Sequence, residues 1–259
     1  MPAFKLTLAY DGTEFAGWQR QTNGLAIQQI VEEALEAIAG HPVRVVASGR
    51  TDAGVHALGQ VAGTSFETRL GSDTIRRSLN AALPPTVRVL RVEEVLDSFH
   101  ARRDARRKTY CYRLLSGLAP TPFAARDAWA VGGHLDVDAM AVAFEAVRGR
   151  HDFSAFQSAG ARVKTKVRNV SDVGLHRAPF VEPWIGSPVA ADDLRLLTAE
   201  ITADGFLRHM VRVIVGSLVE VGRGRWQPRD FIAALESRDR RRAGPTAPAR
   251  GLFLVRVEY

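Results

Sequence analysis

The sequence predicts an α+β fold of two similar-sized sub-domains that share a mainly antiparallel sheet. Expected strands and helices mix along the 259 residues without the regular strand–helix–strand order of a parallel sheet. Several expected strands lie next to short hairpin-like loops, as antiparallel strands do. A polar, basic run at 99–115, FHARRDARRKTYCYRLL, passes directly into a strand and is typical of a junction. We therefore expect one domain over 1–104 and a second over 105–259.

The first half shows clear apolar periodicity. FKLTLAY (4–10) alternates large apolar residues with smaller or polar ones, which predicts a half-buried strand. Helical spacing predicts a helix over 26–39 that ends near Gly40, and 43–48 and 60–66 are expected strands. A second helix is expected over 72–83, capped by Ser72 or Asp73 and stopped by two prolines. VRVLRVEEV (87–95) predicts another strand.

The second half continues the mixed pattern. Tyr110, Tyr112 and Leu114 fall on one face of the strand that follows the basic run. The stretch 176–197 is proline-rich and is expected to be a variable insertion, and RDRRR at 238–242 is an arginine cluster. The remaining expected elements are helices over 136–147 and 206–221, a short helix from about Pro228, and strands over 167–175, 194–203 and 252–259.

Charge and cysteine content limit the possible partners and compartment. The net charge is +7, and since four of the 35 basic residues are lysines, 31 are arginines, which bind phosphates and stack on bases. Arginine-rich genome composition would give the same excess, so charge alone leaves nucleic-acid binding open. The single cysteine, Cys111, excludes an intramolecular disulfide and fits a reducing cytoplasm. No segment resembles a signal peptide or a bilayer span, so we expect no membrane contact.

The glycine-rich stretch GRTDAGVHALGQVA (49–62) is the main chemical candidate. Its glycines leave room for a ligand near the backbone, and it matches no phosphate-binding pattern. Arg50 and Asp52 are two residues apart and can point to one side, where the guanidinium favours the ionised carboxylate of a nucleophile or base. His56 follows four residues later. The alternative is a structural turn in which Asp52 caps backbone amides.

Two further groups of residues could bind an anion or RNA. LRHMVRVIVGSL places Arg208 and Arg212 one helical turn apart on a largely apolar helix, where each guanidinium either meets an anion or extends to water. Tyr110 follows a run of arginines, a pattern that suits single-stranded RNA but also fits a core tyrosine after a solvated connector. His209 has no second ligand at metal spacing, so no metal is predicted.

Seven motifs, in order, closely resemble the tRNA pseudouridine synthase A family. Together they cover nearly the whole chain, and GRTDAGVH alone is a specific motif. They are YDGTEFAGWQRQ (10–21), GRTDAGVHALGQVA (49–62), FHAR (99–102), RRKTYCYRL (106–114), DFSAF (152–156), HMVRVIVGSLVEVG (209–222) and AGPTAPARGLFLVRVEY (243–259).

The resemblance implies an activity and roles for residues. It implies the pseudouridine synthase fold with a basic cleft between the sub-domains. It also implies isomerisation of uridine to pseudouridine at positions 38, 39 and 40 of the tRNA anticodon stem-loop, by a cytoplasmic homodimer without cofactor or metal. By motif, Asp52 corresponds to the essential aspartate, Tyr110 to the tyrosine that stacks on the target base, and Arg212 to the arginine paired with the aspartate. The candidate substrate contacts are Tyr110, Arg50, His56, Phe99, His100, Arg102, Arg106 and Arg107.

Some alternatives stay open at this point. Arg208 stands where relatives often carry histidine or tyrosine, so its role and the preference among the three uridines are open. The sequence does not choose between a covalent sugar ester and a glycal as the intermediate. A catalytically silent tRNA-binding or tRNA-folding protein is the alternative function. A glycoside hydrolase is a weaker alternative, because no second acid accompanies Asp52.

Overall fold

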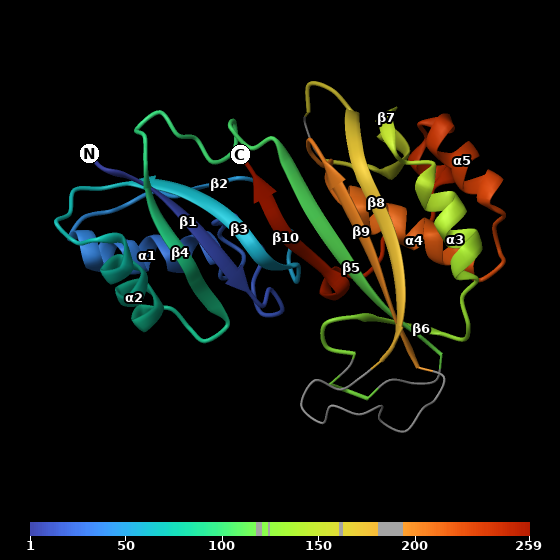
Figure 1. Cartoon of the computed structure of the whole chain (residues 1–259), viewed down its shortest axis with the longest axis horizontal. Helices are drawn as coiled ribbons and strands as arrows, with labels where there is room; N and C mark the ends of the chain where they lie inside the picture. The colour runs from blue at the N-terminus through green and yellow to red at the C-terminus, as the bar shows by residue number, and fades with distance from the viewer. Residues whose placement is uncertain (118–120, 124, 161–162, 181–193) are drawn as a thin grey trace. The chain divides into compact units, whose positions relative to one another are not determined.

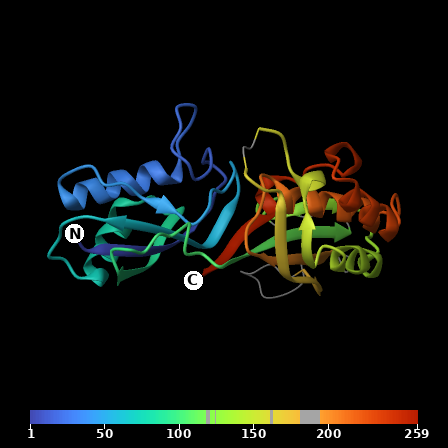
Figure 2. The same ribbon diagram turned by 90° about the horizontal axis from the view of Figure 1, so that it is seen from above.

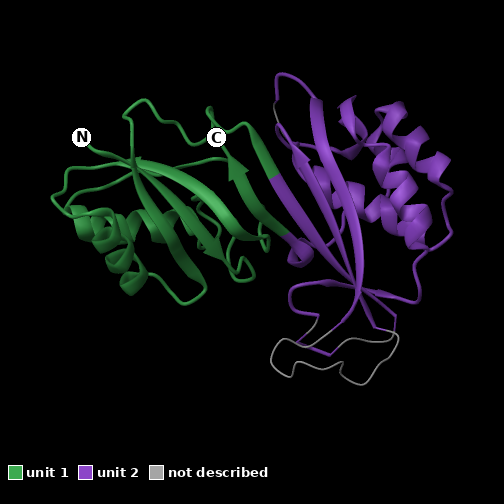
Figure 3. Cartoon of the chain, in the orientation of Figure 1, with its two compact units in different colours: residues 1–108, 253–259 green, residues 109–252 purple. Residues whose placement is uncertain are grey.

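The computed structural model describes residues 1–117, 121–123, 125–160, 163–180 and 194–259, which form two compact units (Figure 3). Unit 1 is Met1–Lys108 with Phe253–Tyr259, and unit 2 is Thr109–Leu252. The last residues group with unit 1 instead of following the predicted division at 104 and 105, because Phe253 and Leu254 pair in parallel with His56 and Ala57. Strands β5 (Arg107–Gly117) and β10 (Leu252–Glu258) each contribute residues to both units.

Unit 1 is a sheet with two helices (Figure 1). Its strands follow the order β4 (Val87–Val95), β1 (Ala3–Tyr10), β3 (His56–Ser65) and β10, with the short β2 (Val46–Ala47) beside β3. β1 runs antiparallel to β3 and β4. Helices α1 (Ile27–Ala39) and α2 (Ser72–Ala82) pack together, and Figure 2 shows α1 lying along one side of these strands.

The apolar pattern explains most of unit 1. Phe4, Leu6, Leu8 and Tyr10 are buried, which confirms the half-buried strand. α1 ends at Gly40, whose φ of 75° is in the left-handed region that glycine adopts readily.

Two local predictions for unit 1 are wrong. The helix α2 is preceded by Gly71 and has no side-chain cap, and Asp73 lies in its first turn and pairs with Arg76 at 2.7 Å. An acidic side chain in the first turn favours the helix through its dipole instead of a capping bond. The expected strand over 43–48 is reduced to two residues, whereas the next strand begins earlier than predicted, at His56.

Unit 2 is also a sheet with helices (Figure 1). Its strands follow the order β5, β9 (Arg195–Ala203), β8 (Val167–Pro179) and β7 (Gly149–Asp152), with β6 (Trp129–Gly132) parallel to β5. Helices α3 (Val137–Glu145), α4 (Met210–Gly222) and α5 (Pro228–Ser237) pack against one another. β3–β10 and β5–β6 are parallel, whereas β1–β3, β1–β4, β2–β3, β7–β8 and β8–β9 are antiparallel, which confirms a mainly antiparallel α+β fold.

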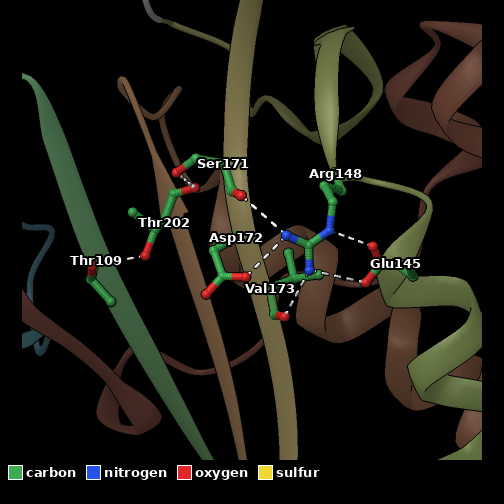
Figure 4. Close-up of polar contacts among 7 residues, drawn as sticks. All are labelled: Thr109, Glu145, Arg148, Ser171, Asp172, Val173 and Thr202. Carbon is green, nitrogen blue, oxygen red and sulfur yellow. Dashed lines mark hydrogen bonds and ion pairs between the residues drawn. The ribbon is translucent and has the colours of Figure 1, made fainter.

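Polar contacts tie the elements of unit 2 together (Figure 4). Thr109 of β5 and Thr202 of β9 are joined by a buried hydrogen bond between their hydroxyls, 2.8 Å long. Arg148, just after α3, pairs with Glu145 and with Asp172 of β8, and also donates to the backbone carbonyls of residues 171 and 173. The end of α3 is therefore fixed to the sheet.

Several expectations for unit 2 are changed by the structure. Tyr110, Tyr112 and Leu114, predicted to share one face of the strand, are all buried. α4 begins at Met210 and not at 206, because His209 has a left-handed φ of 62° and interrupts the helix. Strands β6 and β7 and the 3-10 turns at 154–156, 240–242 and 249–251 were not predicted. Of the predicted insertion at 176–197, residues 181–193 lie outside the described residues, and the rest extends β8 and β9.

Candidate active site

The aspartate loop, residues 48–55, joins β2 to β3 in unit 1. Asp52 is half-buried, and its backbone carbonyl accepts a hydrogen bond of 3.1 Å from Val55 N. Gly54 lies within this turn and has a φ of 74°, a conformation that a residue with a β-carbon rarely adopts. The hydrogen bond therefore fixes the backbone of the turn, and the left-handed φ at position 54 requires glycine.

The loop over 10–21 packs directly on the aspartate loop. A β-carbon at Gly12 would lie 2.1 Å from the carbonyl oxygen of Val55, and one at Gly17 would lie 2.6 Å from the carbonyl oxygen of Thr51. Trp18 N also donates to Thr51 O at 3.1 Å. The glycines of the motif YDGTEFAGWQRQ thus allow close backbone approach to residues on both sides of Asp52.

A buried polar cluster supports the aspartate loop from the sheet. Tyr10 Oη and Thr51 Oγ1 are 2.8 Å apart, and Gln60 reaches both Tyr10 and the backbone of Gly49. Burial raises the pKa of Tyr10 to about 12, although its hydrogen bonds to Thr51 and Gln60 act in the opposite direction. The phenol is therefore neutral at physiological pH and serves as a hydrogen-bonding group.

Lys108, which the sequence did not single out, also contacts the aspartate loop. Its Nζ donates to the carbonyl oxygen of Ser48 at 2.6 Å and lies close to Gly49. Burial, together with the positive charge of Arg102, lowers the pKa of Lys108 to about 8. In the sequence this lysine is indistinguishable from its basic neighbours, because only the pairing of distant strands shows that it turns inward.

The arginines predicted to contact RNA lie at the surface of unit 1. Arg50, Arg102, Arg106 and Arg107 are exposed, and Arg102 is close enough to Lys108 to influence its charge. The pairing of Arg50 with Asp52 stays a prediction. Within unit 1, Arg50 thus belongs to the aspartate loop and Lys108 contacts it, whereas Arg102 acts on Lys108.

His56 and the FHAR motif have clear packing roles. His56 is 3% exposed, its Nδ1 accepts from Gly12 N at 3.2 Å, and its ring stacks on Phe253 with centroids 4.6 Å apart. His100 Nδ1 accepts from two backbone amides of the following turn, and Phe99 packs on Tyr259 at 5.1 Å. Contact with RNA stays a prediction for His56, Phe99 and His100.

Tyr110 and Arg212 belong to unit 2. Tyr110 is 8% exposed, and its ring meets Phe206 edge-on with centroids 4.9 Å apart. Arg212 Nε donates to the carbonyl oxygen of Ala247 at 2.7 Å, and Ala247 N donates back to Arg212 O at 3.0 Å. Tyr112 Oη donates to the neighbouring carbonyl of Pro248 at 2.7 Å. The segment 244–248 therefore fixes the guanidinium of α4.

The predicted placement of Arg208 and Arg212 one turn apart on the same helix is wrong. Arg208 lies before α4, and its guanidinium donates to the carbonyl oxygen of Ala159 at 3.0 Å. Nδ1 of His209, the residue directly before α4, lies 2.8 Å from Ser158 Oγ. Arg208 thus has a local partner in the loop after Phe156, and Arg212 alone is carried by the helix.

The described residues contain neither a metal-binding cluster nor a membrane-spanning helix. Among residues 1–117, 121–123, 125–160, 163–180 and 194–259, no group of three histidine, cysteine or acidic side chains is arranged to hold a metal ion. Within the same ranges no helix is both long and apolar enough to cross a bilayer.

Comparison with known proteins assigns this arrangement to a family. A model of the tRNA pseudouridine synthase family matches residues 7–104 and 143–259, which sets the class of protein. A tRNA pseudouridine synthase A of Parvibaculum lavamentivorans is 41% identical over the whole length of both chains. Relatives of the same name are 44% identical in Beijerinckia indica subsp. indica, with 94% of that protein covered, and 43% identical in Moorella thermoacetica, with both chains fully covered. The chain belongs to the tRNA pseudouridine synthase A family, and the resemblance inferred from its motifs is confirmed.

Proposed function

We propose that this protein isomerises uridine to pseudouridine at positions 38, 39 and 40 in the anticodon stem-loop of tRNA. The observation that carries the proposal is the full-length similarity, 41 to 44% identity, to proteins named tRNA pseudouridine synthase A. Because the substrate is tRNA, we also propose a cytoplasmic location. A homodimer with a basic cleft between the two sub-domains of each chain completes the proposal.

Asp52 is the proposed catalytic carboxylate. The N1–C1′ bond of the target uridine must break, the uracil must turn, and C5 must bond to C1′ while the C5 proton is lost and N1 gains one. An ionised carboxylate can either attack C1′ to form an ester or take the 2′ proton to form a glycal. Both routes need a single carboxylate held in place, and the fixed aspartate loop around half-buried Asp52 supports that role.

Tyr110 and Arg212 are the proposed partners of Asp52. Tyr110 would stack on the everted base and offset part of the few kcal/mol that base eversion costs, and Arg212 would pair with the carboxylate. The family match includes residues 52 and 212, whereas residue 110 lies between its two segments. The role of Tyr110 therefore depends on the motif RRKTYCYRL. Arg50, Arg102, Arg106 and Arg107, all exposed, are the proposed phosphate contacts.

The proposal is tested by turnover and by position. Wild-type protein should release tritium from tRNA labelled as [5-³H]uridine, and Asp52→Ala should abolish release while tRNA affinity is retained. Asp73→Asn, an exposed aspartate of the same unit, is the matched control and should stay active. Full activity of Asp52→Ala would reject the catalytic role, tRNA binding without turnover by the wild type would favour a silent binding protein, and free uracil as product would favour a hydrolase.

The positions are tested separately. Pseudouridine should be mapped by chemical modification on tRNA from a strain that lacks this protein, before and after complementation. Signals that return at positions 38, 39 and 40 support the proposed target. Signals that return elsewhere in tRNA would support the enzyme class and overturn the position.

A further inference from the structure

We propose that Gln60 is a positioning residue for Asp52, because its buried side-chain amide holds the aspartate loop in the place that the isomerisation requires. The inference depends on the proposed function, since the position of Asp52 matters only if that carboxylate acts on RNA. Gln60 lies in β3, eight residues after Asp52, and its proposed role requires no contact with the substrate.

The aspartate loop needs support from outside itself. Residues 48–55 lie between β2 and β3 and contain two glycines, Gly49 and Gly54, whose backbones are intrinsically free. A displacement of about 1 Å in a reacting group can cost on the order of 100-fold in rate. A flexible loop that carries a catalytic carboxylate must therefore be fixed by the surrounding structure.

The side-chain amide of Gln60 contacts the loop directly. Nε2 donates to the carbonyl oxygen of Gly49 at 3.0 Å, and Oε1 accepts from Ser48 Oγ at 2.8 Å. Nε2 also donates to Tyr10 Oη at 3.3 Å, and Oε1 accepts from Val61 N at 3.2 Å. Gln60 is 0% exposed, so these four bonds replace the water that its amide has lost.

A second connection passes through Tyr10. Its hydroxyl accepts from Gln60 and is 2.8 Å from Thr51 Oγ1, to which it can donate. Thr51 directly precedes Asp52 and is 6% exposed. Gln60 thus reaches the loop at residues 48 and 49 by itself and at residue 51 through Tyr10. Both supports come from neighbouring strands, β1 and β3, in which Leu8 pairs with Gln60 and the register shifts between Leu8 and Tyr10.

The chemistry of the contacts specifies glutamine at position 60. Methionine has a similar size, but it would leave the Gly49 carbonyl and two hydroxyls buried without this partner, which costs about 1–3 kcal/mol per group. Glutamate would keep the shape, but an ionised carboxylate cannot donate to Gly49 O or Tyr10 Oη as the amide nitrogen does, and it would bury a charge. Neither substitution can therefore reproduce the support of the loop.

The test separates the chemical step from binding. Gln60→Met and Gln60→Glu should lower the single-turnover rate at saturating enzyme by on the order of 10- to 100-fold, whereas the Kd for tRNA should change by less than about threefold. Thr64→Val is the matched control. Thr64 lies on the same strand, is 8% exposed, and donates to the carbonyl oxygen of Arg44 at 2.9 Å, so its loss perturbs a buried hydrogen bond that does not support the loop. It should keep a rate within about twofold of wild type.

Tyr10→Phe provides an independent readout if the Gln60 variants do not fold. It keeps the ring, which packs on Trp18 at 6.2 Å, and removes the hydroxyl alone. We expect this variant to lose roughly 3- to 10-fold in single-turnover rate. The double variant Tyr10→Phe/Gln60→Met should lose less than the product of the two single losses, because both residues act on Thr51 through one path.

Several outcomes would overturn the role of Gln60. These are folded variants with a rate within about twofold of wild type, an equal loss in Thr64→Val, or a loss confined to tRNA affinity. If the Gln60 variants are unfolded, an unchanged rate in Tyr10→Phe overturns it as well. Wild-type protein that does not modify tRNA would instead reject the proposed function, so the two failures are distinguishable.

Discussion

Lys108 lies against the aspartate loop with its ammonium group largely removed from water. Its Nζ has a backbone partner in Ser48 O at 2.6 Å, and the charge nearby that acts on it is that of Arg102. Burial and like charge both disfavour the protonated form, which explains a pKa near 8 in place of 10.5. This lysine therefore lowers the stability of the folded state at neutral pH relative to a lysine in water.

The lowered pKa of Lys108 gives a pH-dependent stability with a defined sign. Between pH 8 and 10.5 the unfolded state binds more protons at this site than the folded state, so the free energy of unfolding rises with pH. Relative to Lys108→Met, wild-type protein should gain up to about 3 kcal/mol across this window. Urea unfolding of both proteins at each pH measures the difference. A constant difference between wild type and Lys108→Met would contradict the shift.

The variant Tyr110→Phe tests whether the phenol of Tyr110 moves a proton in addition to stacking on the base. Its ring is buried against Phe206, so Tyr110→Phe keeps the packing and removes the hydroxyl. If Tyr110 moves a proton, single-turnover rates should fall by about 10²-fold or more, with tRNA affinity retained. Tyr112→Phe, which breaks the bond to Pro248 O, is the comparison on the same strand. Near-normal turnover of Tyr110→Phe would limit Tyr110 to stacking.

At the scale of elements, helix α4 and the segment 244–248 form one packed unit around Arg212. Gly216 faces the segment so closely that a β-carbon would lie 1.8 Å from Pro245 O, and one at Gly244 would lie 2.7 Å from Ser217 Cα. Ser217 Oγ accepts from Gly244 N at 2.9 Å. Arg212 is therefore held by contacts spread over two segments that are about 30 residues apart in sequence.

Gly216→Ala should destabilise unit 2 even though alanine favours a helix. Helix propensity would add about 1 kcal/mol of stability, but the clash with a backbone carbonyl should cost about 2 kcal/mol or more and displace the segment that holds Arg212. Thermal unfolding and single-turnover rates measure both effects. At Gly71, by contrast, nothing lies within 4 Å of the added carbon, so Gly71→Ala should change stability by less than about 1 kcal/mol. A stability gain in Gly216→Ala would contradict the packing.

At the scale of the whole molecule, the net charge of +7 predicts that tRNA affinity depends strongly on salt. Each phosphate contact releases counterions, so log Kd should rise linearly with log salt concentration, and Arg102→Gln should reduce the slope by about 0.7 to 0.9. Arg77→Gln, an exposed arginine of α2 that pairs with Asp73, should leave the slope unchanged. Filter binding between about 50 and 200 mM salt measures the slope of log Kd against log salt concentration. If the Kd of the wild type for tRNA did not change with salt concentration, the electrostatic model would be rejected.

Much of the fold could be predicted because it depends on local periodicity. The alternation in β1, the amphipathic α1 and the strand at 87–95 need no distant partner to be recognised. The start of α4 could not be predicted, because the left-handed turn at His209 leaves no apolar gap in the sequence. β6 is four residues long and pairs with β5, so its strand character comes from its neighbour.

The sequence by itself determined the family, because GRTDAGVH and six further motifs occur in order over nearly the whole chain, and the proposed site residues are those that the motifs contain. Only the tertiary structure decided how the aspartate loop is held. Gln60, Tyr10 and Lys108 come from strands β3, β1 and β5 and contact the loop or its support through hydrogen bonds of 2.6 to 3.3 Å. Such bonds depend on strand pairing and side-chain direction between residues up to 60 positions apart, as for Lys108 and Ser48, and no local pattern encodes that geometry.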